Sequence, residues 1–382
     1  VGGFSDPLMD CKECKNRVRA DNLIENHSKG AVNPDAMTQE EMQDYINEHQ
    51  VHCPVCGKFN WTPIRNFNLM FSTSRGVTDE STNNIYLRPE TAQGEFVNFT
   101  NVQRTTRAKV PFGIAQIGKA FRNEITPGNF IFRTIEFEQM ELQFFCKEGT
   151  DTTYYEEFKK KAFDFLVDLG FNPEHLRYKD HDKLAHYAKA ACDIQYLFPI
   201  GWSELNGIHN RTNYDLSRHE EYSGKSMQYT DPVTNERYTP YDVEYSIGAD
   251  RLMLAVLSEA YEEQQLDGGD TRVVMHFHPA LSAYKCAVLP LQKNLGDKAK
   301  EIYAKLKKNF MCTYDEAGSI GKRYRRQDEI GTPFCITVDF ETVGDDNTPA
   351  DNCVTVRDRD TMEQVRMPID QLVAYINEKL EF

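Results

Sequence analysis

The sequence predicts an α/β protein, in which a domain built on an antiparallel sheet flanked by helices is followed by a small α/β domain. From residue 66 to 145, β-branched and aromatic residues alternate with polar ones, which is typical of strands. After residue 279, strand-like and helix-like segments alternate, which is typical of a small α/β domain. The chain has 382 residues. A single domain has about 100–200 residues, so two or three domains are expected.

Changes in composition divide the chain into three expected parts. Residues 1–65 carry two pairs of cysteines and the start of the main domain. Residues 66–278 form the main domain, and residues 279–382 form the terminal α/β domain. The Asp-Gly-Gly sequence at 267–269 is typical of a turn near a domain boundary.

Three helices are expected ahead of the terminal domain. A Thr-x-x-Glu capping box opens the first two, at 38–49 and 153–170, and Gly170 is a common residue at a helix C-terminus. The third is expected to begin near Asp250 and to end before Asp267. In the terminal domain the expected order is strand 285–291, helix 294–309, a strand, a loop, strand 334–340, strand 354–357 and helix 369–380.

Composition and charge exclude several classes of protein. Hydrophobic residues make up 40% and charged residues 27% of the chain, as in ordinary globular proteins. There is neither a secretory signal pattern nor an apolar stretch of the roughly 20 residues that span a bilayer, so we expect a cytoplasmic protein. The formal net charge of −15 argues against unspecific binding of nucleic acid over the whole surface. RNA is then expected to contact only a local basic face.

Three strand-like segments carry polar side chains on one face. The first pair of expected antiparallel strands surrounds a turn at Pro127-Gly128. In the second strand of this pair, one face is expected to point to the core and the other carries acidic and amide side chains. Such a pattern is by itself also typical of an amphipathic strand whose polar face contacts water. The core-facing residues are Met140, Leu142 and Phe144, and the opposite ones are Ile135, Phe137, Gln139, Glu141 and Gln143.

Two further strands, Trp202–Glu204 and Asp242–Gly248, are expected to add to this surface. Together the three strands present Glu141, Glu204 and Glu244, and the same segments carry the arginines Arg122, Arg133 and Arg251. Carboxylates suit an ammonium group, and the planar guanidinium suits phosphate. The combination predicts a site for an amino acid beside a nucleoside triphosphate. No GxxxxGK[ST] loop occurs, so the phosphates are not expected to bind in P-loop fashion.

Several segments, taken in order, resemble one enzyme family. Phe121-Arg-Asn-Glu124 followed by Phe132-Arg-Thr-Ile-Glu-Phe137 resembles motif 2 of the class II aminoacyl-tRNA synthetases, and Gly248-Ala-Asp-Arg251 resembles motif 3. The chain is similar to glycyl-tRNA synthetases in particular, and this likeness covers nearly its whole length. The segments that carry it are Leu87–Gly94, Phe137–Glu141, Glu244–Gly248 and Gly318–Gly331.

The resemblance implies an ATP site with Mg²⁺. Arg122 is expected to bind the α-phosphate as the glycine carboxylate attacks it, and Arg251 to hold the γ-phosphate side, which makes these two the catalytic residues. Glu124 is expected to bind the adenine amino group, Phe137 to stack on the ring, and Glu204 to hold Mg²⁺ bridging the triphosphate. The implied ATP-binding set is Arg122, Asn123, Glu124, Phe132, Arg133, Thr134, Ile135, Glu136, Phe137, Glu204, Leu205, Gly248, Ala249, Asp250 and Arg251.

The resemblance also implies a glycine pocket. Glu90, Glu141, Glu244 and Ser246 are expected to line it, and Arg19 to close it. Because glycine has no side chain to grip, the pocket must reject larger amino acids by filling the space beside the ligand. The implied glycine-binding set is Arg19, Glu90, Phe137, Glu138, Gln139, Met140, Glu141, Glu244, Tyr245, Ser246, Ile247 and Gly248.

Two CxxC pairs, Cys11 with Cys14 and Cys53 with Cys56, have the paired spacing of a structural four-thiolate zinc site. The alternatives are two disulfides or four unligated thiols. The stretch between the pairs is longer than in a compact zinc ribbon, so its helix is expected to be an insertion.

The densest positive cluster of the chain lies in the terminal domain. A solvated loop is the ordinary explanation of such a run. The resemblance places it in the anticodon-binding domain, where RNA bases stack on aromatic and Arg side chains, so tRNA contact is expected. The cluster consists of Lys322, Arg323, Arg325 and Arg326, with Tyr324 among them.

The sequence departs from the family pattern at two points. Motif 1, which builds the class II dimer interface, is not visible and is expected ahead of Val1; the expected assembly is a homodimer. Ile135 stands where the family pattern has Arg. Two rival hypotheses are a non-catalytic paralogue that binds nucleic acid as an accessory subunit, and a class IIa synthetase for another amino acid. Arg122 and Arg251 argue against the first, and the glycine-type segments argue against the second.

Overall fold

The computed structural model describes residues 5–34, 37–75, 84–181, 184–185, 187–266, 268–344 and 349–382. The chain forms two compact units. The first comprises Val1–Glu95 with Gln116–Met140, and the second Phe96–Ala115 with Glu141–Phe382. The chain therefore passes from one unit to the other within two strands, β6 (Phe112–Phe121) and β7 (Glu136–Cys146). Among the described helices, none has the length and apolar character that crossing a membrane requires.

The first unit contains a small antiparallel sheet with the strand order β2-β1-β3. Two helices pack beside it, and Met9, Ile24 and Ile46 form a core with no exposed surface. Two further short strands, β4 and β5, pair with each other. The elements are β1 (Ser5–Asp10), β2 (Arg17–Arg19), α1 (Ala20–Ser28), α2 (Gln39–Glu48), β3 (Arg65–Asn68), β4 (Ser72–Ser74) and β5 (Asn84–Tyr86).

The capping box at the start of α2 is confirmed. The Thr38 side chain accepts from the Glu41 backbone N–H (3.2 Å), and the Glu41 carboxylate accepts from the Thr38 backbone N–H (2.7 Å). Each residue thereby satisfies a donor that the first helical turn leaves without a partner. The helix ends at Glu48, one residue before the predicted His49.

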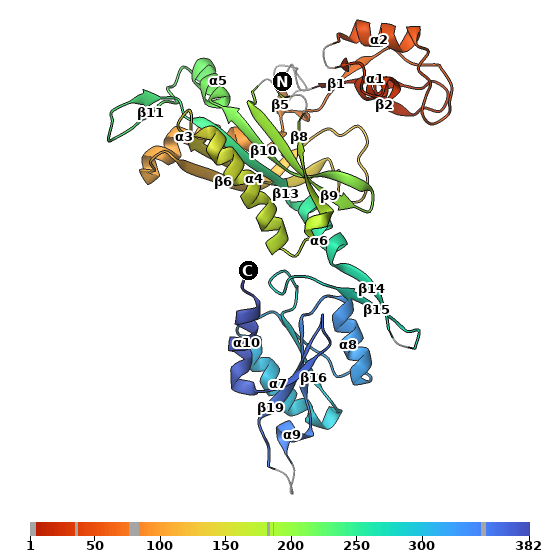
Figure 1. Cartoon of the computed structure of the whole chain (residues 1–382), viewed down its shortest axis with the longest axis vertical. Coiled ribbons are helices and arrows are strands. Elements are labelled where there is room, and N and C mark those ends of the chain that lie inside the picture. The colour runs from red at the N-terminus through yellow and green to blue at the C-terminus, as the bar shows by residue number, and fades with distance from the viewer. Residues whose placement is uncertain are drawn as a thin grey trace. The chain divides into compact units, whose positions relative to one another are not determined.

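The largest sheet has six strands in the order β6-β7-β13-β10-β9-β8. Strands β13, β10, β9 and β8 pair antiparallel, as predicted for the main domain. Helix α4 packs against β10, β13 and β9 (Figure 1). The elements not yet given are α3 (Ala92–Thr106), α4 (Asp151–Asp168), β8 (Leu176–Asp180), β9 (Ala190–Phe198), β10 (Gly201–Thr212), α5 (Tyr214–Ser223), β11 (Tyr229–Thr230), β12 (Arg237–Tyr238), β13 (Tyr241–Gly248) and α6 (Ala249–Ala260).

Three predictions of secondary structure in this region were wrong. Helix α3 occupies 92–106, inside the segment predicted to be strands, because Ala92, Phe96 and Phe99 sit at helical spacing against a core while Val97 is exposed. Helix α4 begins at Asp151 and not after Thr153, although Gly170 ends it as predicted with a φ of +103°. Helix α6 ends at Ala260, and the hairpin of β14 (Tyr261–Gln265) and β15 (Thr271–Met275) replaces its predicted last turns.

Strand β7 alternates with the predicted period, but the burial of its two faces is reversed. The polar residues Glu141 and Gln143 are 5% and 0% exposed. Met140, Leu142 and Phe144, predicted to be the core, are only half-buried, and the Phe144 ring contacts aromatic rings of α4. Both faces of this strand are covered, so alternation alone did not identify the more buried one.

The terminal domain has a five-stranded mixed sheet in the order β17-β16-β18-β19-β20. Helices α7 and α10 pack on one face, where Val288, Ile336 and Ile302 belong to one buried cluster, and α8 covers the other face (Figure 1). The elements are β16 (Cys286–Pro290), α7 (Gly296–Leu306), β17 (Cys312–Tyr314), α8 (Ile320–Glu329), β18 (Phe334–Val338), α9 (Phe340–Val343), β19 (Cys353–Asp358), β20 (Gln364–Pro368) and α10 (Leu372–Lys379).

Most predicted elements of this domain are confirmed, but α8, α9 and β20 were missed. Helix α8 occupies the segment predicted to be a loop, and neither the short helix α9 nor β20 was predicted at all. The high charge of 320–329 concealed the helix α8, because its buried side chains are Arg323, Gln327 and Asp328, while its apolar contacts with the sheet come from the partly buried Ile320 and Tyr324. Strand β20 is an exposed edge strand, and such strands give a weak hydrophobic pattern.

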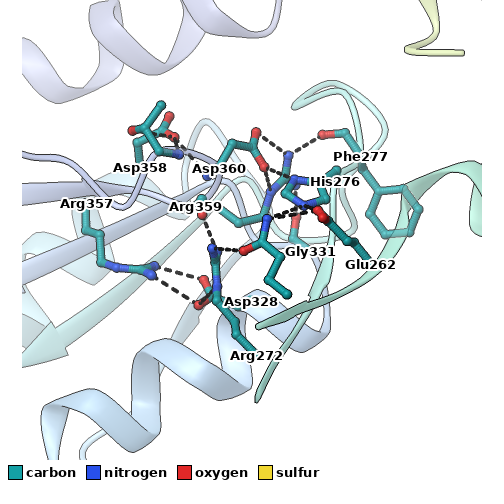
Figure 2. Close-up of polar contacts among 12 residues, drawn as sticks. Glu262, Arg272, His276, Phe277, Asp328, Gly331, Arg357, Asp358, Arg359 and Asp360 are labelled. Carbon is teal, nitrogen blue, oxygen red and sulfur yellow. Dashed lines mark hydrogen bonds and ion pairs between the residues drawn. The ribbon is translucent and has the colours of Figure 1, made fainter. Parts of the chain in front are cut away.

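A buried polar network joins the β14–β15 hairpin to the terminal domain (Figure 2). Asp328 accepts from Arg272 Nε (2.9 Å) and from both terminal nitrogens of Arg357 (2.8 and 3.1 Å). Arg359 donates to the Gly331 carbonyl (2.8 Å). His276 lies between two carboxylates, Asp360 (2.6 Å) and Glu262 (2.8 Å). Charged groups therefore connect these elements.

Candidate functional site

In the first unit, Arg122 is fixed by three contacts. Its backbone N–H donates to the Ile135 carbonyl (3.0 Å), and its Nε donates to the Pro89 carbonyl (3.0 Å). The centre of its guanidinium lies 5.5 Å from the centroid of the Phe137 ring, a distance at which cation–π attraction operates. The predicted phosphate-binding arginine and the predicted adenine-stacking ring are thus neighbours.

The loop from 122 to 135 is held in shape by hydrogen bonds within the unit. The Asn123 backbone N–H donates to the Leu69 carbonyl (2.8 Å), and Gly128 and Arg133 form an antiparallel bridge. Arg133 pairs with Glu124 at 3.1 Å, and their side chains are 49% and 16% exposed. The loop that follows Arg122 therefore contains a largely covered carboxylate, Glu124, paired with the guanidinium of Arg133.

Arg19, the residue predicted to close the glycine pocket, is bound by two carboxylates. It donates to Asp6 (3.0 Å) and forms two hydrogen bonds with Asp21 (3.1 and 2.6 Å). Burial raises the pKa of Asp6. Asp6 pairs with Phe67 across β1 and β3, and the Asn123 N–H donates to the Leu69 carbonyl just after β3, so β3 connects the Arg19 segment with the loop that follows Arg122. Glu90, predicted for the same pocket, accepts from Gln93 Nε2 (2.9 Å).

In the second unit, Glu244 is the centre of a buried polar cluster. Its side chain is 4% exposed. One carboxylate oxygen accepts from Gln143 Nε2 (2.9 Å), the other is bonded to His209 Nδ1 (2.7 Å), and Arg211 Nη1 reaches both oxygens at 3.1 Å. Arg211 also binds Asp215 with two hydrogen bonds (2.8 and 3.0 Å).

This cluster keeps Glu244 ionised. Burial by itself raises the pKa of a carboxyl group, but the charge of Arg211 and the hydrogen bonds from His209 and Gln143 lower the pKa of Glu244 to about 2. Conversely, the Glu244 carboxylate raises the pKa of His209 although burial opposes it. The predicted ammonium-binding residue is therefore a carboxylate at neutral pH, in a position from which water is largely excluded.

Strand β10 presents Glu204 next to Arg251. A bulge lies between Glu204 and Asn206 in the pairing with β9. Arg251, in the first turn of α6, donates to the Glu204 carbonyl (3.0 Å) and lies 3.6 Å from its carboxylate. The Glu204 side chain remains 56% exposed, so this carboxylate is accessible to a cation.

The remaining predicted residues lie on the same few elements. Leu205 and Ile247 are 1% and 3% exposed and belong to the core, and Tyr245 OH accepts from Asn206 Nδ2 (3.3 Å). The exposed fraction of Ile135, which replaces the expected arginine, is 40%. The other predicted site residues lie on four segments. Phe132, Thr134 and Ile135 lie in the loop before β7, and Glu136, Glu138, Gln139 and Met140 lie on β7. Ser246 and Gly248 lie on β13, and Ala249 and Asp250 lie on α6.

Sequence reasoning missed Arg211, His209 and Asp215 as parts of this cluster. Two signals were present: Arg211 and Asp215 are four residues apart, and His209 and Arg211 are two residues apart, hence on one face of a strand that already carried Glu204. Glu244, the partner of His209 and Arg211, is more than thirty residues away in the sequence, so only the pairing of β10 with β13 reveals the cluster.

Comparison with known proteins identifies the family. The model of the class II tRNA synthetase core domain (G, H, P, S and T) matches residues 71–260, and the model of the anticodon-binding domain matches residues 285–379. The glycine–tRNA ligase of Clostridium perfringens is 60% identical over 100% of this chain and 83% of its own length. Those of Caldanaerobacter subterraneus and Acetivibrio thermocellus are 58% and 57% identical over 100% of this chain and 82% of their own lengths. This chain belongs to the glycine–tRNA ligase family.

In this family member the four cysteines of the CxxC pairs gather at one point of the first unit. The Sγ atoms of Cys11 and Cys56 are 3.6 Å apart, those of Cys14 and Cys53 are 3.7 Å apart, and all four lie within 4.8 Å of one another. Tetrahedral zinc with Zn–S bonds of about 2.3 Å separates its sulfurs by about 3.8 Å. The donor set and its spacing therefore fit a structural zinc ion.

The two cysteine turns have matching backbones. The Cys11 backbone carbonyl accepts from the Lys15 N–H and the Cys53 carbonyl from the Gly57 N–H, each at 2.9 Å. The residue after each pair is left-handed, with φ of +61° at Lys15 and +68° at Gly57. The backbone N–H groups of Cys14 and Glu13 lower the pKa of the Cys11 thiol to about 7, whereas burial and the neighbouring thiols raise the pKa of Cys14. In this cluster Cys11 is therefore the thiol that most readily forms the thiolate that binds metal.

The basic run of the anticodon-binding domain lies on α8 and is largely engaged within the protein. Arg323 is 2% exposed and donates to the Pro290 carbonyl (2.6 Å). Arg325 pairs with Asp270 and Arg326 with Asp315, while Lys322 is exposed. The Tyr324 hydroxyl bonds to Thr337 (2.7 Å) and its ring packs under Arg357, so this ring is not presented for stacking on a base.

Proposed function

We propose that this chain attaches glycine to its tRNA, using ATP to form a glycyl-adenylate intermediate. The observation that carries the proposal is the buried carboxylate of Glu244, kept ionised by Arg211, His209 and Gln143 in a chain of the glycine–tRNA ligase family. A fixed anion suits the ammonium group of an amino acid. On this proposal, the side chains around the ligand fill the space beside it, so that an amino acid larger than glycine meets a clash.

Glycine binding is assigned to Glu244, Ser246, Glu141, Glu90 and Arg19. Glu141 is 5% exposed on the strand beside β13 in the sheet. Arg19 is held by Asp6 and Asp21, and on this proposal it stays oriented while the substrate enters. Several carboxylates around a small cation give electrostatic attraction, and the burial of Glu244 and Glu141 strengthens it by lowering the local dielectric constant.

The ATP-binding role is assigned to Arg122, Phe137 and Glu124, with Glu204 and Arg251 toward the far phosphates. Mg²⁺, which class II synthetases use with ATP, supplies charge neutralisation on the triphosphate; the exposed carboxylate of Glu204 fits it. Arg122 stabilises the negative charge that grows on the α-phosphate. No side chain is needed as nucleophile, because the substrate brings its own carboxylate, and catalysis rests on positioning and electrostatics.

The proposed reaction has two steps, adenylate formation and transfer of glycine to the tRNA. A glycine carboxylate oxygen bonds to the α-phosphorus of ATP, and the bond to the bridging oxygen breaks, so that pyrophosphate leaves. A terminal ribose hydroxyl of the tRNA then attacks the carbonyl carbon of the adenylate, loses its proton, and releases AMP. Only the first step is needed for exchange of labelled pyrophosphate into ATP.

This exchange reaction tests the proposal. We expect glycine to support ATP–pyrophosphate exchange, with alanine, serine and proline lower by at least about 100-fold, because the latter three must displace buried groups. Sedimentation of the same preparation is expected to show a homodimer. Exchange supported by another of these amino acids in place of glycine would identify a different class IIa synthetase. A chain that exchanges with none of them would support the non-catalytic paralogue.

We also propose that the four cysteines hold a structural zinc ion. On replacement of the metal by Co²⁺, the thiolate-to-cobalt charge-transfer absorption is expected to appear, and Cys53→Ser is expected to lose it. Hydrogen exchange of residues 5–68 should then rise, because the metal links two turns that are 39 to 45 residues apart in sequence. Cys192→Ser serves as a control outside the cluster. Full protection of these amides in the metal-free protein contradicts a structural role.

The basic helix α8 is proposed to contact tRNA through Lys322 and Arg326, with the exposed part of Arg325 beside them. Arg323 then supports the helix from within. The double variant Lys322→Glu/Arg326→Glu is expected to raise the KM for tRNA by roughly tenfold and to flatten its salt dependence, with glycine-dependent exchange unchanged. Lys308→Glu, an exposed lysine just beyond α7, is the control. Equal losses of charging and exchange would argue that the variant damages the fold and not RNA binding.

A further inference from the structure

Two histidines and an aspartate gather on the face of the large sheet in the second unit, beside the Glu244 cluster. Their donor atoms, one each from His181, Asp193 and His209, lie within 4.8 Å of one another. His181 Nε2 lies 2.9 Å from an Asp193 oxygen, and the two imidazole rings are 5.9 Å apart at 73°. None of the three belongs to the proposed ATP or glycine sets.

The pairing of the strands explains why these side chains meet. The His181 backbone N–H donates to the Ala191 carbonyl (3.0 Å), and Ala191 pairs with His209 across β9 and β10. Asp193, two residues along β9, therefore points to the same face. It pairs with Gly207. The two histidines thus flank the small side chain of Ala191, and the Asp193 carboxylate lies on the same face two residues further along β9.

Gly207 leaves room for the His209 ring to lie beside Asp193. A Cβ atom at position 207 would lie 2.9 Å from His209 Cε1, 3.3 Å from His209 Nε2 and 3.6 Å from an Asp193 oxygen. The first two distances are closer than ordinary van der Waals contact, so a side chain here would displace the His209 ring. The absence of a side chain keeps Nε2 of His209 and the Asp193 carboxylate facing the same space.

The ring of His209 is already oriented for a ligand role. Its Nδ1 is bonded to Glu244 (2.7 Å), and an Nδ1–H that donates to this carboxylate leaves the Nε2 lone pair free for a metal. A carboxylate behind a metal-binding histidine is the usual supporting contact. The side chains of His181, Asp193 and His209 are 34%, 15% and 18% exposed, so the group is partly covered yet open on one side.

We propose that His181, Asp193 and His209 form a binding site for a divalent transition-metal ion of the zinc type. Two imidazole nitrogens and one carboxylate oxygen are a donor set that selects such ions over Mg²⁺ or Ca²⁺, and three protein ligands leave a fourth position for water. Bond lengths of about 2.0–2.2 Å place the donors roughly 3.3 Å apart, which small side-chain rotations provide. The site is separate from the four cysteines and does not depend on the proposed reaction.

Cobalt binding tests the site. Co²⁺ is titrated into protein whose thiols are already filled with zinc, so that absorption from nitrogen–oxygen coordination appears without a thiolate charge-transfer band. We expect one Co²⁺ per chain, and on the order of 100-fold weaker binding in His181→Ala, which removes a ligand without touching Glu244. His175→Ala removes a histidine that also faces a carboxylate, Glu259, but lies outside the group, and it should bind as the wild type does.

A second variant covers the possibility that His181→Ala fails to fold. Gly207→Ala keeps all three ligands and fills the space between two of them, so it should weaken Co²⁺ binding while circular dichroism shows the fold retained. Equal affinity in wild type, His181→Ala and Gly207→Ala would overturn the proposal. Binding of cobalt only after the thiols are emptied would overturn it as well, whatever the outcome of the exchange assay.

Discussion

Arg122→Ala is expected to lower the kcat of glycine-dependent ATP–pyrophosphate exchange by roughly 10²–10³-fold, the usual effect of removing one donor that stabilises transition-state charge. The Pro89 carbonyl and the Phe137 ring hold the guanidinium in one orientation. Since the charge on the α-phosphate grows during attack, the loss is expected mainly in kcat, with a smaller change in the KM for ATP. Initial rates over a range of ATP concentrations measure both.

Two further variants make this result specific. Arg122→Lys keeps the charge but loses the planar fork, so an intermediate activity is expected. Arg65→Ala removes an arginine of the same unit whose side chain is 62% exposed and pairs with Asp10, and it should exchange at the wild-type rate within about twofold. A wild-type kcat in Arg122→Ala would remove this residue from the mechanism. A melting temperature equal to that of the wild type excludes unfolding as the cause.

The sequence predicted the fold class and most strands of the main sheet, because their alternation and turn residues are local signals. The sequence prediction failed where an element buries polar side chains, or where its apolar residues fit both the helical period and the strand period. Helix α8 turns Arg323, Gln327 and Asp328 toward the protein, and β7 buries Glu141 and Gln143, so polarity predicted exposure for residues that are covered. Partners from distant segments satisfy these groups, and no local pattern reports them.

For the candidate site, family resemblance named residues that the structure brings close in each unit, such as Arg122 with Phe137, and Glu204 with Arg251. It did not name the residues that set the charge state of Glu244. Arg211 and His209 reach that carboxylate from the neighbouring strand, and their role follows from strand register and burial. Roles that depend on register need the structure, whereas those tied to a contiguous motif are visible in the sequence.

Asp328→Asn is expected to destabilise the anticodon-binding domain by about 3–5 kcal/mol, because it leaves two buried arginines without their carboxylate. Asp328 and Arg272 are fully buried and Arg357 is 7% exposed, so water cannot replace the lost charge (Figure 2). The substitution keeps the size of the side chain and creates no cavity. Both tryptophans, Trp61 and Trp202, lie outside this domain, so hydrogen exchange of the β16 and β18 amides is the suitable measurement.

Asp270→Asn provides the matched control for this substitution. Asp270 also pairs with an arginine of α8, Arg325, but its side chain is 71% exposed, so a loss of at most about 1 kcal/mol is expected. On the proposed function, Asp328→Asn should lower tRNA charging and leave glycine-dependent exchange intact, since the activation residues lie ahead of residue 260. If both variants lose the same small amount of stability, the buried network of Asp328 contributes no more than a surface ion pair. If Asp328→Asn abolishes exchange as well, the network stabilises the whole second unit and not the anticodon-binding domain alone. This is the alternative because Arg272, one of its members, lies in the β14–β15 hairpin directly after α6.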